Sequence, residues 1–403
     1  MKRLTAFLIA AAVLTCSVSA SAVPEEPSVA VISESLLSAE VASAAALQVG
    51  PELPARSAVL MEQTTGKLLF AKNEREPLPP ASITKVMSLL LVMEAIDRGS
   101  LTLQSEVCCS DHAASMGGSQ IWLEPGEIMT VDELLKAAAI ASANDATVAL
   151  AEAVAGSETA FVELMNQRAA QLGMEDTTFK NAVGLDEEGH LTSARDIAIM
   201  SAELLKYPLI TQYSTVWMSD LRGGETQLVN TNRLIRTYEG ATGLKTGTTS
   251  GAGKCLTATA TRQGLSLVAV VLGCQSSDDR FAAGRALLDH GFANYTCFVP
   301  QLPEEGLTSV EVKRGVERRV QPACTPGSGF VVEKNLVDAI TQRVELQQEL
   351  EAPVEQGQII GRVVVEANGT QLGEYPVTAA TAVERMTWSR ALGLLWRQLC
   401  SMN

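Results

Sequence analysis

The sequence predicts an α/β fold of the α+β kind: an antiparallel sheet backed by a helical lobe, then a small all-β domain and a C-terminal amphipathic helix. Three observations lead to this prediction. Strand-like runs occur at both ends of residues 51–297, and helical stretches lie between them. Residues 304–380 carry short strand-like runs and no helix longer than about two turns. The final residues place Trp and Leu at helical spacing, with Arg between them.

The N-terminus has the pattern of a secretory signal. A basic pair, Lys2-Arg3, precedes the apolar run Leu4–Val18, and Ala20-Ser21-Ala22 follows as a small-residue cleavage site. The run is too short to cross a bilayer as a helix. We therefore expect residues 1–22 to be a signal peptide and the mature protein to lie outside the cytoplasm.

Composition restricts the partners of this chain. Its 403 residues can bury a large core and suggest two domains. The formal charge of −15 and the absence of any long basic run argue against nucleic acid as a partner, because phosphate binding needs a basic face. The only histidines, His112, His190 and His290, lack metal-ligand spacing. We therefore exclude a zinc peptidase and expect no metal.

Cysteines are sparse and show no repeated spacing, so they do not indicate a disulfide scaffold. Cys16, within the signal, makes lipidation an alternative that the preceding Thr15 disfavours. Cys255 and Cys274 lie in two runs that suit neighbouring strands. We expect them to be buried free thiols, with a bridge as the alternative.

The first elements follow from local patterns. Residues 23–50 are rich in Pro, Glu, Ser, Ala and Val, which predicts a linker. Arg56–Gln63 and Lys67–Ala71 flank Thr64-Thr65-Gly66, as in a β-hairpin. Ser82–Arg98 is apolar on nearly every side, so we expect a helix inside the core.

A capping box, Thr130-Val131-Asp132-Glu133, predicts a helix over Val131–Ala141. The pattern breaks at Ser142–Asn144 and resumes as a helix up to Ala155. Strand patterns return after Gly240. The remaining elements expected in residues 51–297 are helices over 158–172, 194–206 and 278–293 and strands over 244–249, 255–262 and 265–272.

Residues 298–383 are predicted to form the small all-β domain. Its strand-like runs are Ser309–Lys313, Gly329–Glu333 and Ile359–Glu366. The terminal segment, residues 384–403, is expected to form the amphipathic helix.

Three short strings, in this order, carry the candidate chemistry: Ser82-Ile83-Thr84-Lys85, Ser142-Ala143-Asn144 and Lys245-Thr246-Gly247. Each alone is weak, because Ser-x-x-Lys occurs by chance in many chains. The ordered set is much more specific, and it is nearly the combination found in serine acyl-transferases.

Ser82 and Lys85 share one face of the predicted helix, about 5–6 Å apart at Cβ. A serine hydroxyl needs a base, and a lysine serves as one when burial and a second cation lower its pKa. The apolar helix would supply the burial and Lys245 the cation. Taken alone, the pair fits an N-cap serine with a snorkelling lysine better than a catalytic pair, and the other two strings reverse this preference.

The other two strings suit substrate binding. The break at Ser142–Asn144 would turn its side chains outward at the edge of the lobe; a simple helix–helix turn is the alternative. Lys245-Thr246-Gly247-Thr248 lies in a predicted edge strand, where Gly247 lets a ligand approach the backbone and Lys245 suits a carboxylate. The N–H groups of Ser82 and Thr248 would form an oxyanion hole. An ordinary glycine turn is the alternative.

The similarity to known serine acyl-transferases extends beyond the three strings. Segments such as Leu123-Glu124-Pro125-Gly126, Asn144-Asp145-Ala146 and Gly184-Leu185-Asp186 resemble the low-molecular-mass penicillin-binding proteins that are D-alanyl-D-alanine carboxypeptidases. The resemblance covers about residues 53–300 and, more weakly, the remainder. The chain departs from the family at Val183, where relatives often carry a histidine.

This resemblance implies a β-lactamase/transpeptidase-like domain over residues 51–297 that removes the terminal D-alanine of peptidoglycan stem pentapeptides and binds β-lactam antibiotics covalently at Ser82. It implies that Ser142 passes a proton to or from the leaving group and that Asn144 holds the substrate amide. The family uses no cofactor. Lys85 or Ser142 would activate the deacylating water.

Endopeptidase or β-lactamase activity remains an alternative, although no Glu-x-x-x-Asn pattern lies between the second and third strings. The non-enzyme alternative is a scaffold that binds cell-wall peptides. The intact Lys85 and Lys245 argue against it, because a binder needs no base.

The C-terminal segment is expected to lie on the outer face of the cytoplasmic membrane. At about 15 residues with several arginines it is too short to span a bilayer, but its two faces suit an anionic lipid surface. A helix packed against the all-β domain is the alternative. The apolar face holds Trp388, Ala391, Leu392, Leu395, Trp396 and Leu399, and the polar face Arg385, Arg390, Arg397 and Gln398.

Overall fold

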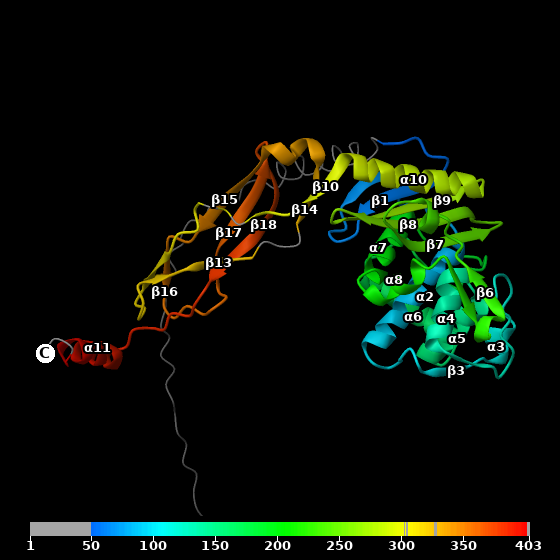
Figure 1. Cartoon of the computed structure of the whole chain (residues 1–403), viewed down its shortest axis with the longest axis horizontal. Coiled ribbons are helices and arrows are strands. Elements are labelled where there is room, and N and C mark those ends of the chain that lie inside the picture. The colour runs from blue at the N-terminus through cyan, green and yellow to red at the C-terminus, as the bar shows by residue number, and fades with distance from the viewer. Residues whose placement is uncertain (1–49, 302, 304, 326–328, 401–403) are drawn as a thin grey trace, which may run out of the picture. The chain divides into compact units, whose positions relative to one another are not determined.

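The computed structural model describes residues 50–301, 303, 305–325 and 329–400. The expected signal peptide (1–22) and all but the last residue of the expected linker (23–50) lie outside the described residues. A five-stranded antiparallel sheet is the centre of the first part of the chain (Figure 1). In spatial order, its strands are β2 (Leu68–Lys72), β1 (Ser57–Glu62), β9 (Leu265–Cys274), β8 (Gly253–Arg262) and β7 (Ala241–Thr249).

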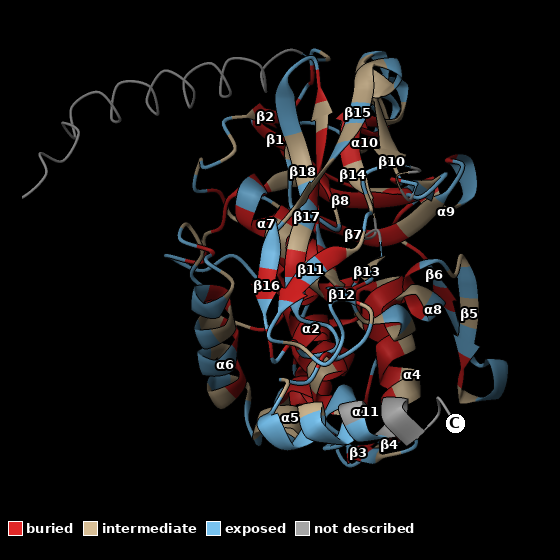
Figure 2. Cartoon of the chain, turned by 90° about the vertical axis from the view of Figure 1, so that its left-hand side faces the viewer, coloured by how far each residue is buried: buried red, intermediate tan, exposed pale blue. Residues whose placement is uncertain are grey.

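Both faces of this sheet are buried, because successive residues of a strand point into different hydrophobic cores. In β1, Val59 and Met61 belong to the core of the helical lobe. Ala58 and Leu60 belong to a second core under α10 (Ser277–Asn294). Figure 1 shows α10 along one face of the sheet and the helical lobe on the other, and Figure 2 shows most of β7 and β8 as buried.

The predicted hairpin and edge strand are confirmed. β1 pairs antiparallel with β2 in the register Leu60↔Phe70. β7, which carries the Lys-Thr-Gly string, lies at the end of the strand order and pairs only with β8 among the described strands. One edge of β7 therefore remains without a strand partner.

The helical lobe contains the expected helices and several short elements. Its helices are α2 (Lys85–Asp97), α3 (Asp111–Ala114), α4 (Val131–Lys136), α5 (Asn144–Ala155), α6 (Glu158–Gln171), α7 (Ala194–Leu204), α8 (Thr211–Ser214) and α9 (Leu234–Thr237). The short hairpins are β3 (Glu106–Cys108) with β4 (Ile128–Thr130), and β5 (Met218–Leu221) with β6 (Thr226–Val229). Short 3₁₀ helices lie at η3 (Pro208–Ile210) and η4 (Arg222–Gly224).

Two helices differ in detail from the sequence prediction. The helix expected from Ser82 begins as a 3₁₀ turn, η1 (Ala81–Thr84), and becomes α-helical only at Lys85. The helix expected to run to Ala141 changes after Lys136 into a π-helical stretch, η2 (Ala137–Ala141). Both irregular turns adjoin the motif residues, and tight or widened turns of this kind often occur at functional sites. Local propensity does not reveal them.

The capping box is confirmed. The Glu133 N–H donates to the Thr130 hydroxyl at 3.3 Å, and the Thr130 N–H donates to the Glu133 carboxylate at 2.9 Å. The two bonds satisfy groups that the first turn of a helix otherwise leaves unpaired. This cap fixes the start of the helix that leads to Ser142.

A third hydrophobic core lies among the C-terminal strands. The three strand runs expected there are confirmed as β11, β14 and β17, whereas the other strands, the long β15 and β18 among them, were not expected. β18 contains Gly373 and Pro376, residues that weaken a strand signal. The strands are β10 (Tyr295–Phe298), β11 (Val310–Lys313), β12 (Arg319–Val320), β13 (Pro322–Cys324), β14 (Phe330–Glu333), β15 (Ile340–Leu346), β16 (Glu349–Glu351), β17 (Ile359–Ala367) and β18 (Thr370–Ala379), with the 3₁₀ helix η5 (Lys334–Ala339).

The last described helix is α11 (Trp388–Cys400). Within the described part of the chain, no helix is long and apolar enough to cross a membrane. Cys255 and Cys274 lie in the paired strands β8 and β9 and are both free thiols, as expected.

Candidate active site

Ser82 and Lys85 meet at the start of α2. The Lys85 Nζ donates to the Ser82 Oγ at 3.0 Å. Ser82 is half-buried, whereas the Lys85 side chain is completely buried. The alternative of a snorkelling lysine is therefore wrong: this amine points inward to the serine instead of outward to water.

Burial lowers the pKa of Lys85 well below its usual range, because the interior disfavours the charged amine. The charge of Lys245 lowers this pKa further, and the carboxylate of Asp145 opposes both effects. A lysine with a lowered pKa can accept a proton at neutral pH. The structure therefore places a base within hydrogen-bond distance of a serine hydroxyl.

The Lys85 amine has a second partner in the loop 180–190, which connects α6 with α7. Its Nζ donates to the carbonyl oxygen of Val183 at 2.8 Å, and the Ser88 hydroxyl donates to the carbonyl of Ala182 at 2.6 Å. Val183 is the position at which the chain departs from the family pattern. The contact uses the backbone, so it does not depend on the side chain there.

The Ser142–Asn144 string joins η2 to α5. Ser142 adopts the left-handed conformation, with φ 65°, which ends the helix and turns the chain. Asn144 is fixed from two sides: its N–H donates to the Ser119 carbonyl at 2.7 Å, and its side-chain amide donates to the Gly117 carbonyl at 2.6 Å. Among the described residues, the Ser142 Oγ and the Asn144 Oδ1 are buried without a hydrogen-bond partner. Such atoms are rare in proteins and suit a group that a ligand will pair with.

Asp145, which the sequence analysis did not single out, organises the loop facing this string. Its buried carboxylate accepts the N–H of Ile121, at 3.1 and 3.2 Å, and that of Leu123 at 3.1 Å. Arg222 holds the same loop through the Ile121 carbonyl at 2.9 Å. An acidic residue next to a motif asparagine was visible in the sequence, but its partners more than twenty residues away were not.

The Lys245–Thr248 string approaches the Ser82 turn closely. A Cβ on Gly247 would lie 2.9 Å from the Pro80 carbonyl oxygen and 3.1 Å from the Ser82 nitrogen, so a side chain there would clash. The Thr246 hydroxyl donates to the Thr231 hydroxyl at 2.7 Å, and the Thr231 N–H donates to the carbonyl of Ile140 in η2 at 3.2 Å. These contacts connect β7 both to η1 and to the helix before Ser142.

Lys245 is buried as completely as Lys85 but has fewer contacts. Its Nζ donates to the carbonyl of Thr246 at 3.2 Å. Burial lowers the pKa of Lys245 to about 7, and the charge of Arg280 contributes to this shift. The amine therefore loses its charge near pH 7, and an incoming anion would stabilise its charged form.

Arg280 on α10 is a second residue that sequence reasoning missed. Its Nη1 donates to the Gly247 carbonyl at 3.0 Å and to the Thr248 hydroxyl at 3.1 Å, and only 8% of the residue is exposed. The guanidinium thus supports β7 from the face opposite the helical lobe. No local pattern distinguishes Arg280 from other arginines of the helix, because its role depends on the strand order.

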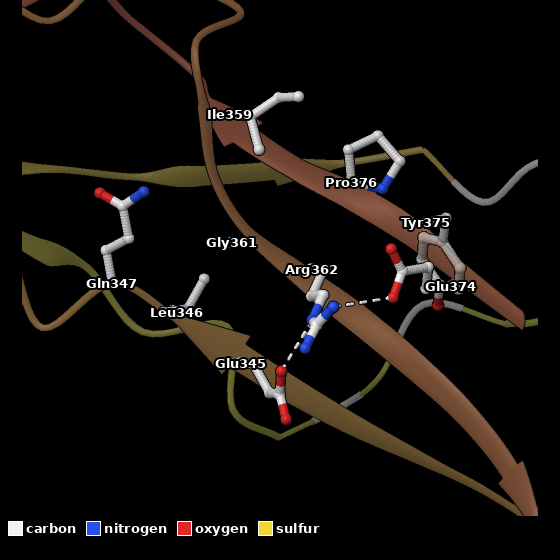
Figure 3. A pocket seen from close by; sticks show the side chains of 9 residues that line it. All are labelled: Glu345, Leu346, Gln347, Ile359, Gly361, Arg362, Glu374, Tyr375 and Pro376. Atoms are coloured by element: carbon white, nitrogen blue, oxygen red, sulfur yellow. Dashed lines mark hydrogen bonds and ion pairs between the residues drawn. The ribbon is translucent and has the colours of Figure 1, made fainter. Parts of the chain in front are cut away.

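The C-terminal strands carry a pocket of about 580 Å³ that contains no motif residue. In Figure 3, Arg362 lies between Glu345 and Glu374, with which it forms ion pairs. These ion pairs lie at an open surface, where ion pairs contribute little to stability. No group of three or more metal-ligating side chains occurs in the described ranges.

Two family models match the chain. The model described as D-alanyl-D-alanine carboxypeptidase matches residues 42–276, and the model described as the C-terminal domain of penicillin-binding protein 5 matches residues 304–385. The first covers more than half of the chain and includes all three motif strings.

Known proteins agree with these matches. The D-alanyl-D-alanine carboxypeptidase DacF of Bacillus subtilis is 44% identical over 329 residues, covering 81% of this chain and 85% of the relative. Penicillin-binding protein 5 of Haemophilus influenzae has a similar structure, with a TM-score of 0.72 and 29% identity over 83% of this chain and 99% of that one. Cefotaxime-bound penicillin-binding protein D2 of Listeria monocytogenes aligns with a TM-score of 0.56 and 30% identity, over 61% of this chain and all of the other.

Proposed function

The chain belongs to the family of serine-type D-alanyl-D-alanine carboxypeptidases, and from this premise we propose that it removes the terminal D-alanine of peptidoglycan stem pentapeptides through an acyl-enzyme on Ser82. The observation that carries the proposal is the 3.0 Å contact between the completely buried Lys85 amine and the Ser82 hydroxyl. Covalent reaction with β-lactams, typical of the family, would use the same serine.

In the first step, the Ser82 Oγ attacks the carbonyl carbon of the penultimate D-alanine, and neutral Lys85 takes the hydroxyl proton. The N–H groups of Ser82 and Thr248 stabilise the oxyanion. The C–N bond then breaks as the leaving amine receives a proton through Ser142, and D-alanine departs. Water, activated by Lys85 or Ser142, hydrolyses the ester and restores the serine.

The remaining motif residues bind the substrate. The unpartnered Asn144 Oδ1 accepts the N–H of a substrate amide. Lys245, with the hydroxyls of Thr246 and Thr248, binds the terminal carboxylate, and Gly247 lets this strand lie directly against the Ser82 turn. Arg280 adds positive potential beneath this strand. Burial makes each charge contact stronger than it would be in water.

The test combines labelling and turnover. Fluorescent penicillin should label the wild type at one site and leave Ser82→Ala unlabelled, while Ser100→Ala, on an exposed turn, labels normally. The wild type should release D-alanine from a peptide ending in D-Ala-D-Ala. Labelling of Ser82→Ala, or no D-alanine release by the wild type, would refute the proposal. Cross-linked dimers and a chromogenic cephalosporin distinguish endopeptidase and β-lactamase activity.

The proposed domain organisation is a catalytic domain over residues 51–297 and a small all-β domain over 298–383, after a signal peptide and a linker. The family matches at 42–276 and 304–385 and the separate C-terminal core support these limits. The protein acts on peptidoglycan, so we place it outside the cytoplasm. N-terminal sequencing of the secreted protein should begin near Val23.

The proposed membrane contact is α11. Trp388, Leu392 and Trp396 recur every four residues on one side of this helix and are 89%, 68% and 71% exposed. The side chains of Leu395, Arg397, Gln398 and Leu399 lie outside the described residues. Exposed tryptophans beside arginines suit the headgroup region of an anionic membrane.

A truncated protein tests this contact. The chain should end after Thr387, because Val383 belongs to the C-terminal core and the Met386 N–H donates to the Arg314 carbonyl at 2.7 Å. The shortened protein should keep its carboxypeptidase activity and lose binding to anionic liposomes at low salt. Equal liposome binding with and without α11 would overturn the proposal.

A further inference from the structure

The loop 180–190 contacts the nucleophile turn on its inner side. A Cβ on Gly184 would lie only 1.8 Å from the carbonyl oxygen of Ala81, so the two backbones touch. His190 closes this loop; it is 2% exposed and packs edge-on against Phe179 with ring centroids 5.9 Å apart. None of the motif chemistry described above uses this histidine.

The hydrogen bonds of His190 determine its tautomer. The Lys180 N–H donates to the His190 Nδ1 at 3.2 Å, so this nitrogen carries no proton. The Nε2 lies 2.9 Å from the Thr84 Oγ1. Since the Thr84 hydroxyl donates its one proton to the Ala81 carbonyl at 2.9 Å, it accepts from the His190 Nε2–H. Two hydrogen bonds in series, with fixed donor directions, therefore connect His190 through Thr84 to the Ala81 oxygen.

The Ala81 carbonyl, where this hydrogen-bond series ends, belongs to a residue with an unusual backbone conformation. Ala81 has φ +49°, a left-handed conformation that residues other than glycine rarely adopt. Its carbonyl and the Ser82 N–H belong to the same planar peptide group and point in opposite directions. Any interaction that fixes the Ala81 oxygen therefore also fixes the direction of the Ser82 N–H.

We propose that His190 is a positioning residue: acting through Thr84, it holds the Ala81–Ser82 peptide so that the Ser82 N–H points at the oxyanion. The inference rests on the proposed function, because this N–H is one of the two oxyanion donors assigned there. Burial lowers the pKa of His190 to about 4, which keeps the ring neutral and the bond direction constant at working pH. Such donors act only when they are aligned before the reaction.

Two pairs of variants test the hydrogen bonds from His190 through Thr84. Thr84→Val keeps the side-chain volume but removes the hydroxyl, whereas Thr84→Ser keeps the hydroxyl. His190→Leu removes both ring contacts, whereas the amide of His190→Gln can accept from Lys180 and donate to Thr84. We expect Thr84→Val and His190→Leu to lower kcat and the penicillin acylation rate by about 10- to 100-fold with KM within about twofold. Thr84→Ser and His190→Gln should recover most of the rate.

A matched control separates positioning from stability. The hydroxyl of the buried Thr192 pairs with that of Thr177 at 2.8 Å, outside the nucleophile turn. Thr192→Val should lower Tm but leave kcat per titrated active site unchanged. Thr84→Val should lower kcat per titrated site and weaken binding of a peptide boronic acid, which mimics the tetrahedral intermediate.

The outcomes distinguish this inference from the proposed function. A wild type that neither labels at Ser82 nor releases D-alanine refutes the proposed function itself. If the wild type is active and Thr84→Val keeps the wild-type kcat per titrated site, or changes only KM, His190 is merely structural. If His190→Leu does not fold, the Thr84 pair decides alone.

Discussion

Two segments of the site, the Ser82–Lys85 turn and the Ser142–Asn144 break, are both largely buried but differ in hydrogen bonding. The Ser82 hydroxyl, the Thr84 hydroxyl and the Lys85 amine all have partners within the protein. In the break, the Ser142 Oγ and the Asn144 Oδ1 have no partner among the described residues. The first segment is complete before substrate arrives, whereas in the proposed mechanism the second is completed by substrate.

Replacing the lysine of the Ser82–Lys85 turn should have the largest effect. Lys85→Arg should reduce acylation by about 10³-fold or more, because a guanidinium cannot accept a proton and general bases contribute up to about 10⁴-fold. The measurement is the second-order rate of fluorescent penicillin labelling. A Lys85→Arg protein with more than about a tenth of the wild-type rate would show that Lys85 is not the base.

Removing the unpartnered Ser142 hydroxyl should have the second-largest effect, which is on turnover. Ser142→Ala should lower kcat by about 10²-fold, because one proton transfer to the leaving group is lost. The measurement is steady-state D-alanine release, with circular dichroism to check folding. If kcat is unchanged, another group protonates the leaving amine.

Lys245→Arg should cause a smaller loss, about 10-fold, mainly in KM, because the charge that attracts a carboxylate is kept but its geometry is changed. Equal tolerance of arginine at positions 85 and 245 would show that the roles of the two lysines are assigned wrongly.

Lys245→Arg should also change the pH profile of kcat/KM. The pKa of Lys245 is about 7, and only the charged form attracts a carboxylate, so kcat/KM of the wild type should fall as pH rises above about 7. Bound carboxylate favours the charged amine, so the corresponding limb of kcat should lie at higher pH. Lys245→Arg should lose the alkaline limb, since arginine stays charged. A limb that persists in Lys245→Arg belongs to a different group.

The smallest effect is on stability and tests the contrast directly. Ser142→Ala removes a buried oxygen without a partner, so it should leave stability unchanged or raise it by about 1 kcal/mol. Ser82→Ala removes a partner of the buried Lys85 amine and should lower stability by about 1 kcal/mol. Urea unfolding of both variants provides the comparison. Equal destabilisation would mean that Ser142 is satisfied in solution, for example by water.

Patterns within a few residues predicted much of the fold. The hairpin of β1 and β2, the Thr130 capping box and the strand character of β7 all follow from residues close together in the sequence. The 3₁₀ turn at Ala81 and the π-helical stretch before Ser142 do not, because they arise where packing overrides local propensity. The strand β18 was missed because its glycine and proline weaken the strand signal.

The three motif strings and the closeness of Ser82 to Lys85 can be read from the amino-acid sequence, because a spacing of three residues places both on one side of a helical turn. Three further contacts depend on how the chain packs: Asp145 binds the loop at Ile121, Arg280 supports Gly247 and His190 reaches Thr84. These partners are 24, 33 and 106 residues apart in the chain. Side-chain periodicity reports only which way a residue faces within its own element, whereas long-range contacts depend on the strand order and on how the helices pack.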